Sequence, residues 1–203
     1  MKIDLRKIPT YCITAEKFPD RQKEVKRICK EIGIENLTII NGPIEKPYAP
    51  AVAKTHIMAL ANEGPVFIIE DDIALTNSWY HTVEIPEDCE ALYVGTSSYG
   101  MIRETTMYNG CISSSYDDTM VKPYNMLGLH AILYINEDYK KKISSILQDY
   151  VDSPGEPGPN NGCDNPIAIQ MKNFNILALR KPMFYQNDGH TNEATLAEMN
   201  PIF

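Results

Sequence analysis

The stretch Val66-Phe67-Ile68-Ile69-Glu70-Asp71-Asp72 joins four apolar residues directly to three carboxylates. A short apolar run of this kind, placed just after Gly64-Pro65, is typical of a strand that is buried on both faces of a parallel sheet. Adjacent carboxylates repel one another and are rarely buried without partners, so their position indicates a cation nearby. The stretch therefore predicts a buried strand that ends in a metal or substrate site.

Strands and helices are expected to alternate on both sides of this stretch. Further runs typical of strands lie at 10–14, 37–40, 91–94, 131–135, 176–179 and 183–185. Helical patterns lie at 25–32, 51–61 and 139–150. We therefore expect one α/β domain over residues 1–203, with a mostly parallel central sheet flanked by helices and with residues 190–203 as a C-terminal tail.

Composition argues against several classes of protein. The formal net charge is −8, whereas a dedicated binder of nucleic acid or anionic lipid shows a basic surplus. No stretch reaches the roughly 18 apolar residues that cross a membrane, and the segment Met1 to Lys7 lacks the apolar part of a secretory signal. The five cysteines are scattered, which favours reduced, mostly buried thiols. We expect a cytoplasmic protein of a bacterium, or of a virus within its host.

The three carboxylates suit a hard divalent cation. Mn²⁺ and Mg²⁺ prefer carboxylate oxygens, keep some waters and bridge substrate phosphates. In an extended segment Glu70 and Asp72 point to one side and Asp71 to the other. One side can hold a metal while the other meets a ribose hydroxyl or a backbone amide, and the two roles can be exchanged. The structural alternative is an ordinary acidic turn after a strand.

Several segments together resemble glycosyltransferase family 25, which contains lipooligosaccharide and collagen galactosyltransferases. In chain order these segments are Ile13-Thr14, Asp20-Arg21, Ala53-Lys54-Thr55-His56, the stretch 67–73, the stretch 128–134, Asp164, and Pro182 with Gln186. Each segment is weak alone, and the resemblance depends on their common order. The opening departs from the family pattern, because Thr14 to Arg21 replaces the usual Asn-Leu-acid beginning, and Thr55-His56 replaces Ser-His.

The resemblance implies a GT-A fold and sugar transfer from a nucleotide-sugar donor with the help of Mn²⁺ or Mg²⁺. The donor implied is a UDP-sugar, and the acceptor hydroxyl belongs to a glycan or, as alternatives, to a protein side chain or a modified DNA base. We expect an inverting displacement. The donor-binding residues implied are Thr14, Arg21, His56, Glu70 and Asp71. The metal ligands implied are Asp72, Glu70 and His190.

Three further residues have a functional and a structural interpretation each. Asp164 follows the Pro/Gly-rich loop 152–163 and precedes a short helix, so it is a candidate general base or a helix N-cap. We expect that loop to close over the donor. His130 is a candidate acceptor contact or a hydrogen-bonded core histidine. Trp79 is a candidate sugar-stacking platform or a packing residue at a helix start.

Two other functions stay open at this stage. A metal-dependent phosphohydrolase or nucleotidyltransferase would use the same carboxylates, although such sites usually cluster several His and Asp ligands. The four histidines are far apart in the sequence, at His56, His81, His130 and His190. A non-catalytic module that binds sugar nucleotides is the second alternative.

Overall fold

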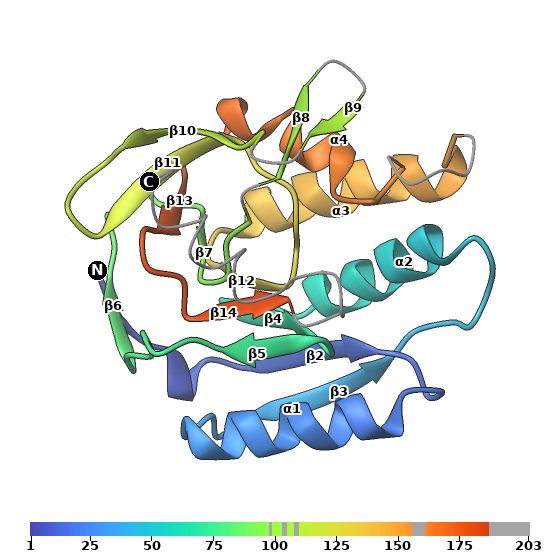
Figure 1. The fold of residues 1–203 in the computed structure, drawn as a ribbon, viewed down its shortest axis with the longest axis horizontal. Helices are drawn as coiled ribbons and strands as arrows, with labels where there is room; N and C mark the ends of the chain where they lie inside the picture. Colours follow the sequence, from blue (N-terminus) through green and yellow to red (C-terminus); the bar gives the residue numbers. More distant parts are fainter. Residues whose placement is uncertain (98, 103–104, 108–109, 156–160, 187–203) are drawn as a thin grey trace.

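The structure of the chain is a computed structural model, which describes residues 1–97, 99–102, 105–107, 110–155 and 161–186. An eight-stranded sheet forms its centre (Figure 1). The strands lie in the order β10 (Ile112–Ser115), β11 (Met120–Asn125), β13 (Ile176–Leu179), β7 (Ala91–Tyr93), β12 (Ala131–Tyr134), β4 (Val66–Glu70), β2 (Thr10–Thr14) and β3 (Leu37–Asn41).

The sheet is mostly parallel, as predicted. β2 pairs in parallel with β3 and β4, and β13 pairs in parallel with β7. β12 lies antiparallel between β4 and β7, and β11 lies antiparallel between β10 and β13. Among the described strands of this sheet, β11 and β12 therefore run against the direction of the other six. The α/β fold class with a central sheet flanked by helices is confirmed.

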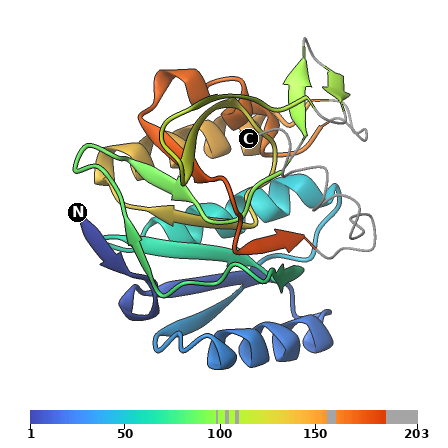
Figure 2. The same ribbon diagram turned by 60° about the vertical axis from the view of Figure 1, so that its left-hand side comes forward.

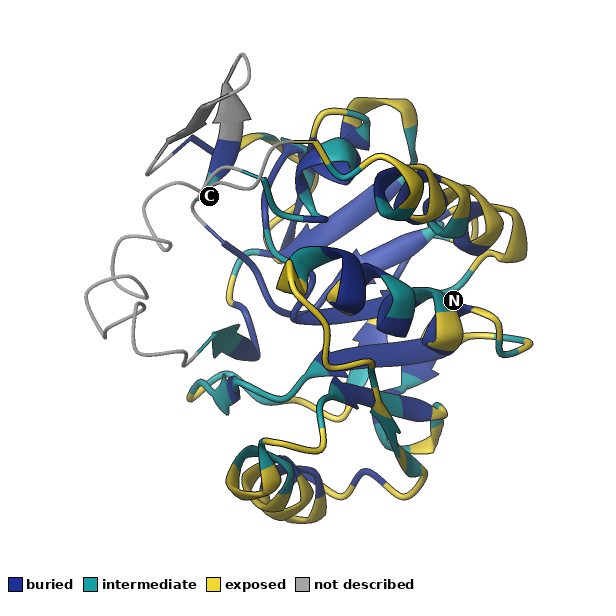
Figure 3. Cartoon of the chain, turned by 90° about the vertical axis from the view of Figure 1, so that its right-hand side faces the viewer, coloured by how far each residue is buried: buried dark blue, intermediate teal, exposed yellow. Residues whose placement is uncertain are grey.

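Helices cover both faces of the sheet (Figures 1 and 2). They are α1 (Pro19–Glu31), α2 (Tyr48–Leu60), α3 (Glu137–Asp152) and α4 (Asn165–Ala168), with 3-10 turns η1 (Leu5–Lys7) and η2 (Met171–Asn173). One core cluster combines residues of α2, α3 and α4 with one face of the sheet, and a second combines α1 with the other face. Figure 3 shows the central strands fully buried while the helices keep exposed outer surfaces.

β4 has the two-sided burial that its apolar sequence predicts. Val66 and Ile68 belong to the core cluster under α2 and α3, whereas Phe67 and Ile69 belong to the cluster under α1. All four residues are 0% exposed. Burial of such side chains contributes about 1.5–3 kcal/mol each to folding. The strand is therefore fixed firmly, and it presents Glu70 at its carboxyl end.

Three small two-stranded sheets surround the central sheet. They pair β1 (Lys2–Asp4) with β6 (Thr82–Glu84), β5 (Ile73–Leu75) with β14 (Phe184–Gln186), and β8 (Gly100–Ile102) with β9 (Thr105–Met107). The strand predicted at 183–185 is thus real but lies outside the central sheet. Its pairing with β5 places Gln186 opposite Ile73, next to the carboxylate stretch.

The remaining expectations concern the cysteines, membrane-spanning helices, and the predicted tail and loop. All five cysteines are buried and free. None of the described helices is long and apolar enough to cross a membrane. The predicted tail 190–203 and the middle of the predicted loop, residues 156–160, lie outside the described residues.

Candidate functional site

A cavity of about 390 Å³ opens at the carboxyl ends of the parallel strands β2, β3 and β4. Ligands of α/β sheets bind at this edge because the loops that follow the strands meet there. The residues that line it and matter below are Thr14, Lys17, Phe18, Arg21, Tyr48, Glu70, Asp71, Asp72 and Gln186. The structure therefore brings together donor-binding residues predicted from segments far apart in the sequence.

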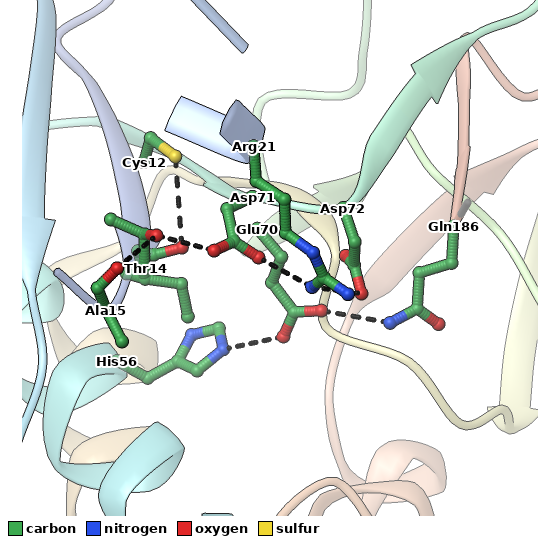
Figure 4. Close-up of polar contacts among 10 residues, drawn as sticks. Cys12, Thr14, Ala15, Arg21, His56, Glu70, Asp71, Asp72 and Gln186 are labelled. Atoms are coloured by element: carbon green, nitrogen blue, oxygen red, sulfur yellow. Dashed lines mark hydrogen bonds and ion pairs between the residues drawn. The ribbon is translucent and has the colours of Figure 1, made fainter. Parts of the chain in front are cut away.

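Asp71 is held by two of the predicted residues (Figure 4). The Thr14 hydroxyl donates a hydrogen bond to Asp71 Oδ2. The two residues are neighbours because the parallel pairing of β2 with β4 places Ile13 beside Glu70, and Thr14 and Asp71 directly follow them. Arg21, in the first turn of α1, donates from Nη1 to Asp71 Oδ1 at 3.1 Å. These contacts fix Asp71 in one orientation.

Arg21 also forms an ion pair with the next carboxylate. Its Nη1 lies 3.8 Å from Asp72 Oδ2, and its guanidinium carbon lies 4.8 Å from the centre of the Phe18 ring. The Arg21 side chain is 39% exposed, whereas those of Asp71 and Asp72 are only 10% and 13% exposed. The aspartates therefore already hold one cationic group at the wall of the cavity.

Glu70 is engaged through both carboxylate oxygens. His56 Nε2 lies 3.2 Å from Glu70 Oε1, and Gln186 Nε2 donates to Glu70 Oε2 at 3.1 Å. Burial opposes ionisation of Glu70, but the contacts with His56, the nearby His130 and the hydrogen bond from Gln186 together lower the pKa of Glu70 below its ordinary value. His56 itself is 0% exposed, so the pair is a buried link between α2 and β4. Glu70 is therefore an anchored carboxylate rather than a loose one.

Asp164 does not act as a side-chain cap of α4. Its carboxylate makes no capping hydrogen bond and instead accepts one from the Gly128 amide at 2.8 Å. Burial raises the pKa of Asp164, and the negative charge of Glu70 adds to the shift while the Gly128 amide opposes it. A raised carboxylate pKa is the property that a general base needs near neutral pH. The capping interpretation is wrong for the side chain, and the general-base interpretation stays a prediction.

His130 lies in the interior behind Glu70. It is 2% exposed, and a Cβ atom at Gly95 would lie 2.4 Å from its Nε2 atom. Gly128, with φ +100°, closes the other side of the ring. Burial lowers the pKa of His130, although the charge of Glu70 and the backbone of Phe184 oppose the shift. The ring does not line the cavity, so its predicted contact with an acceptor stays a prediction.

Trp79 lies away from the cavity, in an irregular segment rather than at a helix start. Its indole nitrogen donates to His81 Nδ1 at 3.1 Å, and its ring meets the Phe184 ring edge-on at 5.7 Å between centres. His190 lies outside the described residues. The acceptor and metal roles of these two residues stay predictions.

The sequence patterns did not indicate three further residues that line the cavity, Lys17, Phe18 and Tyr48. Lys17 Nζ lies 4.7 Å from the centre of the Phe18 ring and 4.1 Å from that of the Tyr48 ring. Tyr48 is 51% exposed. A usable signal was the position of Lys17 and Phe18 just after β2 and of Tyr48 at the start of α2, the helix that follows β3.

The chemistry of the carboxylates fits Mn²⁺ or Mg²⁺ only if the substrate supplies further ligands. Within the described part of the chain, no three His, Cys, Asp or Glu side chains converge on one point. Mg²⁺, however, is usually bound by one or two carboxylates together with substrate phosphates. Asp71 and Asp72, which already face a guanidinium cation, are consistent with that kind of site.

Comparisons with known proteins give distant structural similarities and no family. No protein-family model and no curated protein matches the sequence. A UDP-glucose pyrophosphorylase in complex with UDP-glucose is similar with a TM-score of 0.46 and 15% identity, over 95% of this chain and 80% of that one. The CTP:phosphocholine cytidylyltransferase of Streptococcus pneumoniae has a TM-score of 0.44 and 13% identity, over 96% and 98% of the two chains. A glycosyltransferase involved in the glycosylation of the major capsid of PBCV-1 has a TM-score of 0.37 and 9% identity, over 95% and 98% of the two chains. The resemblance to glycosyltransferase family 25 stays a prediction.

Proposed function

We propose that this protein is a glycosyltransferase that moves a sugar from a UDP-sugar to an acceptor hydroxyl, with inversion at the transferred carbon. The observation that carries the proposal is the cavity at the ends of β2, β3 and β4, where carboxylates, cations and aromatic rings face one space. A nucleoside diphosphate needs these three kinds of group, because it combines a flat base, a hydroxylated ribose and two phosphates.

Each part of the donor has a matching group in the cavity. The Phe18 and Tyr48 rings offer flat surfaces for the base, and both already attract the Lys17 ammonium. Asp71, held by Thr14 and Arg21, is oriented to accept a hydrogen bond from a ribose hydroxyl. The Lys17 and Arg21 cations offset phosphate charge, including the charge that develops on the leaving diphosphate.

Metal participation is part of the proposal. Asp72 would hold Mn²⁺ or Mg²⁺, which when bound would offset charge on the leaving diphosphate. Glu70, the other carboxylate predicted as a ligand, is engaged by His56 and Gln186 in the structure. His190 is the proposed additional ligand. Arg21, which holds Asp71 and is partly exposed at the cavity, would also face the donor phosphates.

Asp164 is the proposed general base. Its ionised carboxylate takes the proton of the acceptor hydroxyl as that oxygen attacks the sugar carbon and the bond to the diphosphate breaks. The Gly128 amide holds the carboxylate in place before reaction. Asp164 lies close enough to Glu70 for their charges to interact. Because Glu70 lines the donor cavity, this proximity supports a role for Asp164 beside the donor.

Binding and product analysis test this function. Arg21→Ala is expected to weaken UDP-sugar binding by roughly tenfold or more, since a charge-assisted contact is worth about 1.5–3 kcal/mol. Arg27→Ala is the matched control, because Arg27 lies on the same helix and pairs only with Glu24 and Glu31 in the described structure. Equal effects of both changes in calorimetry would contradict the assigned cavity.

The reaction products separate the alternatives. A glycosyltransferase releases UDP and extends an acceptor. Release of pyrophosphate from UTP and a sugar phosphate would indicate a nucleotidyltransferase, and release of inorganic phosphate without an acceptor would indicate a phosphohydrolase. Binding without turnover of any of these substrates would indicate a non-catalytic module.

A further inference from the structure

His130 is a buried polar residue that the proposed reaction does not use. It directly precedes β12, the strand that lies between β4 and β7 (Figure 1). The residue is 2% exposed, and among the described residues neither ring nitrogen makes a hydrogen bond of good geometry. A buried imidazole without such a partner costs free energy that an apolar side chain would not. Residues that break a packing rule in this way are expected to serve a site rather than the stability of the core.

The ring of His130 spans the gap between two glycines. Its Nε2–Cδ2 edge faces Gly95 so closely that a Cβ atom there would lie 2.4 Å from Nε2 and 2.5 Å from Cδ2. Its Nδ1–Cε1 edge faces Gly128, where a Cβ atom would lie 3.1 Å from Nδ1. The first distances leave no room for a side chain, and the φ angle of +100° at Gly128 also favours glycine. Two edges of the imidazole therefore pack against glycine backbone.

The Gly95 side of the ring is a fixed wall. The amides of Val94 and Gly95 both donate to the carbonyl oxygen of Ala131 at 3.0 Å. Gly95 also pairs with Phe184 in an isolated parallel bridge. The ring therefore rests against backbone that is held from two sides, and it limits how far Gly128 can move toward β7.

The Gly128 side of the ring is the backbone that holds the proposed base. The Gly128 amide donates to Asp164 Oδ2 at 2.8 Å. Residues 126–129 belong to no helix or strand, so strand pairing does not fix this amide. The carbonyl oxygen of His130 in turn accepts from the Glu70 amide at 2.9 Å. His130 thus joins the segment that holds the base to the end of β4, where the three carboxylates begin.

We infer that His130 is a positioning residue, whose ring between Gly95 and Gly128 holds the Gly128 amide where it orients the Asp164 carboxylate for proton transfer. The inference rests on the proposed function for the role of Asp164. His130 itself takes up no proton in this scheme and needs no contact with the acceptor. The support that the ring gives to Gly128 can be measured without turnover.

Amide hydrogen exchange followed by NMR tests that support. His130→Ala is expected to make the Gly128 amide exchange roughly tenfold faster or more relative to the amides of β12, because its hydrogen bond to Asp164 would open more often. Ile132→Val is the matched control, since Ile132 is 0% exposed on β12 but is not among the nearest neighbours of either glycine. His130→Gln keeps most of the buried volume and should change the exchange in the same direction if His130→Ala does not fold. Unchanged relative exchange of Gly128 would overturn the inference.

Turnover then separates positioning from packing. His130→Ala is expected to lower kcat by roughly tenfold to a hundredfold, the effect of a misplaced catalytic group. KM for the UDP-sugar should change little, because His130 does not line the donor cavity. In the Asp164→Asn background the same change should lower turnover by less than about twofold, since the group that it positions is already lost. Ile132→Val should keep both constants.

Two kinetic outcomes overturn the inference. One is a full further loss of turnover when His130→Ala is added to Asp164→Asn, and the other is a rise in KM without a fall in kcat. A protein that transfers no sugar would instead contradict the proposed function. The exchange of the Gly128 amide would then still decide whether the His130 ring holds it.

Discussion

At the scale of single residues, Glu70, Asp71 and Asp164 are each held by hydrogen bonds from distant parts of the chain. The apolar stretch 66–69 followed by three acids was enough to predict a buried strand with a polar end. The hydrogen-bond partner of each acid could not be predicted, because Thr14 and Asp71 are 57 positions apart in the sequence and Gln186 and Glu70 are 116 positions apart. Such pairs depend on which strands become neighbours, and local sequence patterns contain no such information.

Asp164→Asn is expected to lower turnover by roughly two to four orders of magnitude, the usual contribution of general acid–base catalysis. The asparagine oxygen can still accept the hydrogen bond from the Gly128 amide, so folding and donor affinity should change little. Turnover and UDP-sugar affinity measured on one preparation check this. Near-normal turnover would remove Asp164 from the mechanism.

The pH dependence of turnover should report the same residue. Asp164 must be ionised to take a proton, and its pKa is raised above the ordinary 3.8 by burial. Turnover is therefore expected to rise with pH through that raised pKa, so the acidic limb of the rate profile should lie above the ordinary carboxyl value of 3.8 in the unchanged protein. The residual activity of Asp164→Asn should lack this limb.

At the scale of elements, helices and buried strands were easier to predict than the edge of the sheet. α3 begins as its sequence indicates, with Asn136 Oδ1 accepting from the Tyr139 amide at 2.9 Å. β10 and β11 were not predicted, because one is a serine-rich strand and the other contains Pro123, which usually argues against a strand. Pro123 is tolerated because the register between the two strands shifts beside it, and bulges of this kind accommodate proline.

The junction between β3 and α2 gives a prediction at this scale. A Cβ atom at Gly42 would lie 1.9 Å from the Thr55 hydroxyl oxygen, so Gly42→Ala should destabilise the protein by about 1–3 kcal/mol through overpacking. Thr55→Ala removes that oxygen. The double variant should therefore be more stable than the sum of the two single changes, by roughly 0.5 kcal/mol or more, in urea unfolding. Strict additivity would show that the two residues do not meet.

At the scale of the whole molecule, the stability of the fold should depend on its donor and metal. A UDP-sugar at a hundredfold excess over its dissociation constant should stabilise the protein by about 2.7 kcal/mol, and Mn²⁺ should be required for the effect. Asp72→Asn keeps the shape of the side chain but removes its charge, so it should abolish the part of the thermal shift that depends on metal. Asp138→Asn, a similar change at a 91% exposed side chain of α3 that does not line the donor cavity, is the control. A shift that persists in EDTA would contradict the metal requirement.

The position of β12 has a consequence for the protein while it is being synthesised. β4 pairs with β2 on one side, but its other edge is covered only when β12 arrives, about 60 residues further along the chain. Until β12 has been synthesised, the amide and carbonyl groups along this edge of β4 have no partner strand. Such an unpaired apolar edge can pair with other chains. Expression at high rates or high temperature should therefore favour aggregation through β4, and a chaperone that shields this edge during translation should raise the yield of folded protein.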